Sequence, residues 1–178
     1  MPRLIDTHCH LDFENFDEDR EEVISRASDM GVGAIIVPAI DLQNCKKVLR
    51  IAESHPNIYA AVGIHPNSSK EWQNDDLIQL KELAQHDKVV AIGEIGLDYY
   101  RNFSPQDTQR DAFNQQLDLA IELNLPVIIH NREADDDILS ILARKKNDSD
   151  RVTGVLHSFS TRVEVARSAV IMGYLLIS

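Results

Sequence analysis

The sequence predicts an α/β fold, an incomplete (β/α)₈ barrel of about seven βα units in one domain over residues 1–178. Short apolar runs alternate strictly with helical stripes, and such alternation indicates parallel strands joined by right-handed crossovers. A doubly wound open sheet also fits the alternation, but no G-x-G-x-x-G follows the opening strand, which argues against that fold. The third observation is that most of the histidines lie at the ends of the predicted strands, where barrels place their chemistry.

Seven short apolar segments are the predicted strands. Most are continuous runs of Val, Ile, Leu and Ala, which is typical of strands that a parallel sheet buries on both faces. Pro38 stops the second run, and Pro126 precedes the fifth. The segments are residues 4–5, 34–37, 58–64, 89–92, 127–129, 152–156 and 174–177.

Amphipathic stripes lie between these strands, and several carry helix start signals. Asp41 is a predicted N-cap. Ser104 is a second, because proline and then an acid follow it in the first turn. Thr161 and Glu164 form a predicted capping box. The helical stripes lie at residues 23–30, 45–52, 77–84, 113–121 and 138–142, and a polar break is expected at 145–150.

Composition excludes several classes of protein. The net charge of −11 argues against a broad basic surface for nucleic acid, although bound metal ions could supply local positive charge in a nuclease. Two cysteines are too few for a disulfide framework, which favours the reducing cytoplasm. We expect no signal peptide and no membrane span, because no apolar stretch approaches the roughly 20 residues that a span needs.

Five of the seven histidines and one glutamate lie at or just past the ends of predicted strands. In a parallel barrel these ends meet at one face, so scattered residues become one constellation. Each residue alone fits a polar side chain where a strand meets a loop, but six together favour a site. In an extended strand the first two histidines share a face with Asp6 behind them. The six are His8, His10, His65, Glu94, His130 and His157.

Imidazole and carboxylate ligands without cysteine suit Zn²⁺, Mn²⁺ or Fe²⁺, and also Mg²⁺ where phosphate oxygens join the shell. Glu94 has two oxygens and could bridge two ions. Two bridged ions would activate a water and neutralise charge on a phosphoryl group.

Five segments in order carry a family resemblance: DTHCHLD (6–12), GIHP (63–66), GEIGLDY (93–99), PVIIHNR (126–132) and HSFS (157–160). They resemble the successive motifs of the TatD family of metal-dependent deoxyribonucleases, which are amidohydrolase-like barrels. The resemblance implies a TIM-type barrel and hydrolysis of phosphodiester bonds in DNA, often as a 3′–5′ exonuclease. It also implies divalent metal, two ions of Mg²⁺, Mn²⁺ or Zn²⁺, at His8, His10, Glu94, His130 and His157, with Glu94 as the catalytic bridge.

The sequence departs from that family at its C-terminal end. The family has an eighth strand and, near it, a Glu-Thr-Asp-x-Pro motif whose Asp binds metal, whereas this sequence stops after the predicted seventh strand. Seven strands cannot close an eight-stranded barrel, so the two outer strands keep open edges that favour self-association. We therefore expect a C-terminally truncated barrel that binds metal weakly and hydrolyses DNA poorly.

Other residues near the predicted site have two interpretations each. By resemblance His65 contacts a substrate phosphate, but an ordinary loop histidine is the alternative. Arg132 could clamp a phosphate with its planar fork or form a surface salt bridge. Asp98 could orient a metal ligand or cap a turn. The acids at 135–137 indicate a helix first turn rather than a metal site.

Aromatic residues and Cys9 also have two interpretations. Trp72, Tyr99 and Tyr100 could stack on bases, although packing is the commoner role. Cys9 alternates away from its neighbouring histidines and is expected in the core.

Two other functions remain open. One is an amidohydrolase-type hydrolase of a small ester, amide or lactone. Its sites often use a carboxylated lysine, where this sequence has Glu94 and no lysine close behind any strand. The other is an inactive paralogue.

Overall fold

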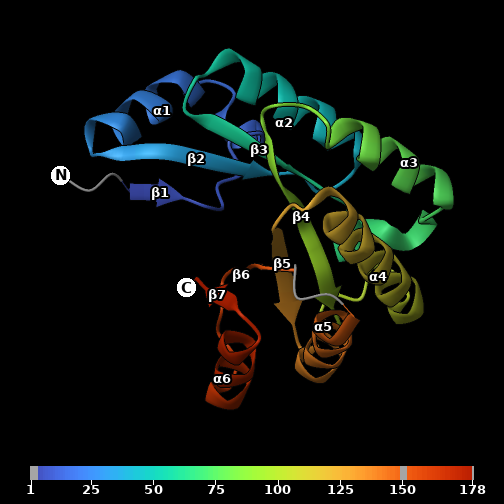
Figure 1. Ribbon diagram of the computed structural model, residues 1–178. Helices are drawn as coiled ribbons and strands as arrows, with labels where there is room; N and C mark the ends of the chain where they lie inside the picture. The colour runs from blue at the N-terminus through green and yellow to red at the C-terminus, as the bar shows by residue number, and fades with distance from the viewer. Residues whose placement is uncertain (1–3, 149–151, 178) are drawn as a thin grey trace.

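The computed structural model describes residues 4–148 and 152–177 of the chain, and its seven strands form one parallel sheet (Figure 1). The strands are paired in chain order from β1 to β7, without a reversal. A doubly wound sheet reverses its order at a switch point, so this order confirms the barrel-type arrangement. The strands are β1 Leu4–Asp6, β2 Val32–Pro38, β3 Ile58–Val62, β4 Val89–Asp98, β5 Val127–Arg132, β6 Gly154–Leu156 and β7 Tyr174–Leu176.

Helices cover the convex side of the curled sheet (Figure 1). The main core lies between them and the sheet, where Cys45, Phe113 and Ile138 are fully buried. A second, small cluster consists of Ala61, Ala91 and Ile128. The helices are α1 Arg20–Asp29, α2 Leu42–Ser54, α3 Asn74–Leu83, α4 Gln106–Leu123, α5 Asp135–Asp148 and α6 Val163–Ile171, with 3₁₀ turns η1 Glu14–Phe16 and η2 Pro66–Glu71.

Several predicted boundaries were wrong. β4 and β5 are longer than the apolar runs suggested, so Glu94 and His130 lie inside strands instead of at their ends. A polar break was predicted at 145–150, but α5 continues through Asp148, so the prediction was wrong for residues 145–148. Residues 149–150 lie outside the described part of the chain. Hydrophobic runs mark only the part of a strand that is apolar, while backbone pairing extends further.

Of the three predicted helix caps, one was confirmed and two were wrong. Asp41 caps α2, and its Oδ1 accepts a hydrogen bond of 2.7 Å from the Asn44 amide. Ser104 does not cap α4, because Pro105 holds that position. Thr161 was also wrong as a cap, since its hydroxyl donates to Asp135 and Arg162 precedes α6.

Gly96 allows β4 to approach β5 beside the histidines. Its φ is +136°, and a Cβ placed there would lie 2.1 Å from the carbonyl oxygen of His130. Only glycine tolerates both conditions. Its register partner is His130, so the close approach brings β4 and that histidine together.

The two outer strands, β1 and β7, each pair with one neighbour among the described residues. Leu4 and Ile5 on β1 are each 62% exposed, and Leu175 on β7 is 68% exposed. Within the described part of the chain, no helix has both the length and the apolar character needed to cross a bilayer.

Candidate metal centre

Glu94 lies at the centre of the predicted constellation, with only 4% of its side chain exposed. Its Oε1 lies 2.6 Å from Nε2 of His157 and 2.8 Å from Nδ1 of His130. Its Oε2 lies 3.4 Å from Nε2 of His8 and 3.5 Å from Nε2 of His10. The two carboxylate oxygens therefore face two different pairs of imidazoles, as bridging of two ions requires.

The rings also contact one another across this carboxylate. The His8 and His157 rings stack at 3.9 Å, which joins the loop after β1 to the loop after β6. The Nε2 atoms of His8 and His10 are 3.2 Å apart. Donor atoms within 4.8 Å of one another form two groups that share Glu94: His8 with His157, and His65 with His130.

The loop after β1, and not a continued strand, brings the first two histidines together. β1 ends at Asp6, and the prediction that Asp6 stands behind the rings was wrong, because its Oδ1 accepts from the His8 backbone amide at 3.1 Å. Asp12 has that position instead, with Oδ1 3.6 Å from Nδ1 of His10. Asn44 donates a 2.8 Å hydrogen bond to the other oxygen of Asp12. The sequence feature that could have pointed to Asp12 is its position two residues after His10.

Asp98 has the matching position on the other side of the site. Its Oδ2 lies 3.2 Å from Nε2 of His130 and accepts a 2.9 Å hydrogen bond from Asn67. Its Oδ1 accepts from the Arg101 amide at 2.8 Å, so Asp98 both orients a histidine and caps a turn. Each side of the site thus has a buried aspartate held by an asparagine amide, an arrangement that fixes ligand rings.

His65 accepts a backbone hydrogen bond at one of its two ring nitrogens. The Asn67 backbone amide donates a 3.0 Å hydrogen bond to its Nδ1. In a neutral imidazole the other nitrogen then carries the hydrogen, so Nε2 is a donor, 3.5 Å from Oε1 of Glu94. A metal ligand needs a free lone pair, whereas a phosphate oxygen accepts such a hydrogen bond. The geometry therefore favours the predicted substrate contact for His65, despite its place in a candidate ligand group.

Charge at the site favours a cation. Burial raises the pKa of Glu94, but hydrogen bonds from the surrounding histidines outweigh it and hold the pKa well below its usual value. Burial lowers the pKa of His10, yet Asp12 and Glu94 raise it to about 9. Burial lowers the pKa of His8. An ionised, buried carboxylate among imidazoles fits a divalent ion, which would displace the proton of His10 on binding.

The candidate ligand groups among the described residues contain no cysteine. Burial raises the pKa of the Cys9 thiol to about 11. Its side chain packs against the core, as predicted.

A family model described as TatD related DNase matches residues 5–178. The chain belongs to this family. It is 44% identical to the uncharacterized metal-dependent hydrolase YabD of Bacillus subtilis, across 97% of this chain and 67% of that protein. It is 41% identical to the 3′-5′ ssDNA/RNA exonuclease TatD of a Pantoea species, across 78% of this chain and 54% of that protein.

Solved structures of TatD proteins confirm the fold. The crystal structure of YjjV, a TatD homologue from Escherichia coli, matches with a TM-score of 0.89 and 40% identity, over 98% of this chain and 67% of that one. A TatD-family hydrolase from Entamoeba histolytica matches with a TM-score of 0.86 and 29% identity, over 98% of this chain and 64% of that one. The chain thus spans about two thirds of these structures.

The TatD-type site opens into a hollow of about 490 Å³. Arg132 lines it, with its guanidinium 4.1 Å from the centre of the Tyr100 ring. No ion pair of Arg132 exists among the described residues, so its predicted salt bridge is not found there. Trp72 and Tyr99 pack against the core, as expected of the commoner role. Sequence reasoning missed Phe103 and Arg101, which also line the hollow but lie outside the family motifs.

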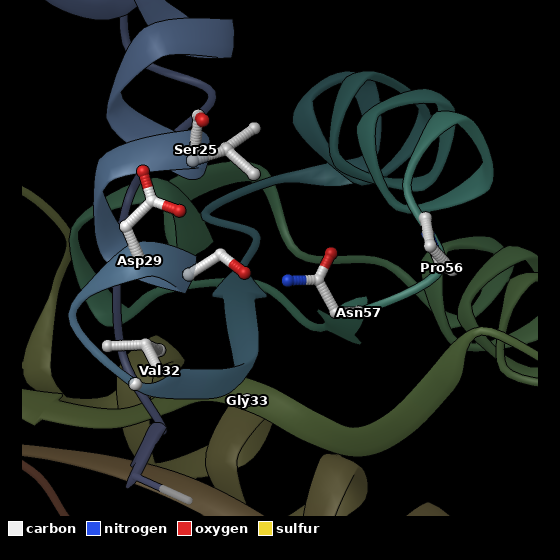
Figure 2. Close-up of a pocket in the computed structure, with 9 residues that line it drawn as sticks. Ser25, Asp29, Val32, Gly33, Pro56 and Asn57 are labelled. Carbon is white, nitrogen blue, oxygen red and sulfur yellow. The ribbon is translucent and has the colours of Figure 1, made fainter.

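A second hollow of about 470 Å³ lies at the opposite ends of the strands (Figure 2). Ser25 and Asp29 from α1 face Asn57 across it, beside the start of β2. Barrel enzymes place their chemistry at the carboxyl ends of strands, so this hollow is not the site.

Proposed function

We propose that this chain hydrolyses phosphodiester bonds in DNA with two divalent ions, as a 3′–5′ exonuclease acting on single strands. The observation that carries the proposal is Glu94, whose two oxygens face separate pairs of imidazoles. Membership of the TatD-related DNase family supports it, as do the relatives named as 3′-5′ ssDNA/RNA exonucleases.

The proposed ligands are His8 and His10 on one side, His130 and His157 on the other, and Glu94 between them. When bound, the ions would be Mg²⁺, Mn²⁺ or Zn²⁺, and would activate a water and neutralise charge on the phosphoryl group. Glu94 stays ionised because its neighbours hold its pKa low.

Two further residues are proposed to hold the substrate. His65 donates from Nε2 toward a phosphate oxygen, because its Nδ1 already accepts the Asn67 amide. Arg132 offers a planar guanidinium at the wall of the same hollow.

The test is release of nucleotides from a 5′-labelled single strand with added Mg²⁺ or Mn²⁺. We expect shortening from the 3′ end, and a loss of roughly 10³-fold or more in rate for Glu94→Gln, because a neutral amide neither bridges ions nor balances their charge. Glu22→Gln is the matched control, since Glu22 is 79% exposed on α1 and should leave the rate unchanged. Equal rates for Glu94→Gln and the unchanged chain would contradict the proposal.

The same assay separates the alternatives. Turnover of small esters or lactones without nucleotide release would favour the amidohydrolase-type activity. No turnover of either would favour an inactive paralogue. None of the described residues that line the hollow is a lysine, which favours the nuclease.

We also infer that residues 1–178 form one domain that works in the cytoplasm, which two free cysteines support. The low activity expected from the sequence stays a prediction. So does self-association, which the exposed apolar side chains of β1 and β7 support.

A further inference from the structure

The outer wall of the catalytic hollow has an unusual composition for an acidic chain. Acids outnumber bases by 29 to 18 in the whole sequence. The carboxylates that line the hollow, Glu94 and Asp98, are both buried at its floor, 3% and 1% exposed. The exposed lining residues are instead two aromatics, two arginines and two serines: Phe13, Phe103, Arg101, Arg132, Ser68 and Ser158.

The loop between β4 and α4 carries two of these six residues, Arg101 and Phe103, and it also carries Tyr100. Phe103 is 65% exposed and Tyr100 is 59% exposed. The Arg132 guanidinium lies over the Tyr100 ring at 4.1 Å, which makes a flat cation-aromatic surface beside the hollow. Aromatic rings exposed next to arginines are the combination that holds unpaired bases and their phosphates.

We propose that Tyr100, Arg101, Phe103 and Arg132 form a base-binding rim that takes a single-stranded nucleic acid and aims its end at the metal centre. Phe103 stacks on one base, the Tyr100–Arg132 pair holds a second nucleotide, and Arg101 contacts the backbone. Duplex bases are stacked inside their helix and cannot use these rings. The inference rests on the proposed nuclease function and names the residues that would hold its single-stranded substrate.

The net charge of the chain leads to a prediction for the salt dependence of binding at this rim. A protein of net charge −11 cannot hold a polyanion by a broad basic surface, so stacking must supply much of the binding. Each phosphate neutralised on a single strand contributes about −0.7 to the slope of log affinity against log salt. Two arginines thus predict a slope of about −1.4, shallow for a nucleic-acid-binding protein.

Fluorescence anisotropy with a labelled ten-nucleotide strand tests the rim without turnover, in EDTA so that no hydrolysis occurs. We expect Phe103→Ala and Tyr100→Ala each to weaken binding at least about 5-fold, the lower end for loss of a stacked base. Phe103→Tyr keeps the ring and should keep the affinity within about 2-fold. Met30→Ala is the control, because Met30 is 80% exposed at the end of α1, beside the opposite hollow. A blunt duplex of equal length should bind at least about 5-fold more weakly. Comparing the affinities of a DNA strand and an RNA strand shows which of the two nucleic acids the rim prefers.

Three results would overturn the rim: alanine variants that bind like the unchanged chain, equal affinity for strand and duplex, or no binding of the strand. Circular dichroism checks folding, and Phe103→Tyr guards against a merely structural effect. The outcome is independent of the nuclease test. Rim-dependent binding without nucleotide release would overturn the nuclease proposal alone, whereas release with rim-independent binding would overturn the rim alone.

Discussion

The two sides of Glu94 are built from different parts of the sheet. On the Oε1 side, His130 lies within β5 and His157 directly follows β6, and both strands are paired on two edges. On the Oε2 side, His8 and His10 lie in the loop after β1, a strand of three exposed residues that pairs only with β2 among the described residues. Strand register therefore positions the inner side, while loop contacts position the edge side.

The edge side compensates with side-chain contacts. The Cys9 amide donates to the Ile36 carbonyl at 3.1 Å, and Leu11 is fully buried, so the loop is fixed between the two. The Phe13 ring stacks on His10 at 4.4 Å. On both sides an aspartate lies beside a histidine ring and accepts a hydrogen bond from an asparagine side chain. The lesson is that either a paired strand or a loop with an orienting carboxylate can place imidazoles beside the same glutamate.

The largest expected effect tests whether the two sides share one residue. Glu94→Gln should remove both ions, because each side uses one oxygen of the same carboxylate. Metal content after equilibrium dialysis against Mn²⁺ should fall from two ions per chain to none at concentrations that fill the unchanged chain, a loss of about 100-fold or more in affinity.

Glu22→Gln should keep both ions. Retention of one tight ion in Glu94→Gln would show that one side holds its metal without the carboxylate, and the two sides would then be independent sites.

Substitutions of the two orienting aspartates should have a smaller effect, a loss of metal affinity on one side of Glu94 at a time. Asp12→Asn should weaken the ion beside His10, and Asp98→Asn the ion beside His130, each by about 10–100-fold, the usual cost of losing a partner that orients a ligand. Both variants keep side-chain size, and each amide can still meet its asparagine neighbour. Calorimetric titration with Mn²⁺ should show two unequal sites in each variant. An equal change at both sites in either variant would mean that the sides are coupled through Glu94.

The same comparison explains how far the sequence could lead. The βα alternation identified all seven strands, because a buried parallel strand is a continuous apolar run bounded by breaks. His130 and His157 were predicted as site residues for that reason, since each follows an apolar run directly. His8 and His10 were predicted by their spacing. The structure places all four beside Glu94, but the predicted reason for the convergence of His8 and His10 was wrong, because the strand ends at Asp6.

What the sequence could not reveal depended on contacts between distant segments. Asn44 and Asn67 are 32 and 31 residues from the aspartates they hold, and neither belongs to a local pattern. The exposure of Phe103 is likewise a tertiary fact. Apolar residues in loops are usually packed, so a phenylalanine between β4 and α4 gave no signal until its neighbours were placed.

The smallest expected effect concerns the open edge itself. Ile5 is 62% exposed on β1, and a strand edge with exposed apolar side chains favours pairing with another copy. A lysine there repels such pairing, so Ile5→Lys should weaken concentration-dependent association by several-fold, about 1 kcal/mol, in sedimentation velocity. Ile78→Lys is the matched control, because Ile78 is 58% exposed on α3 and away from either edge strand. The prediction fails if the unchanged chain stays monomeric at all concentrations, or if both variants associate equally. Either result would show that the edge strand β1 does not mediate association between copies of the chain.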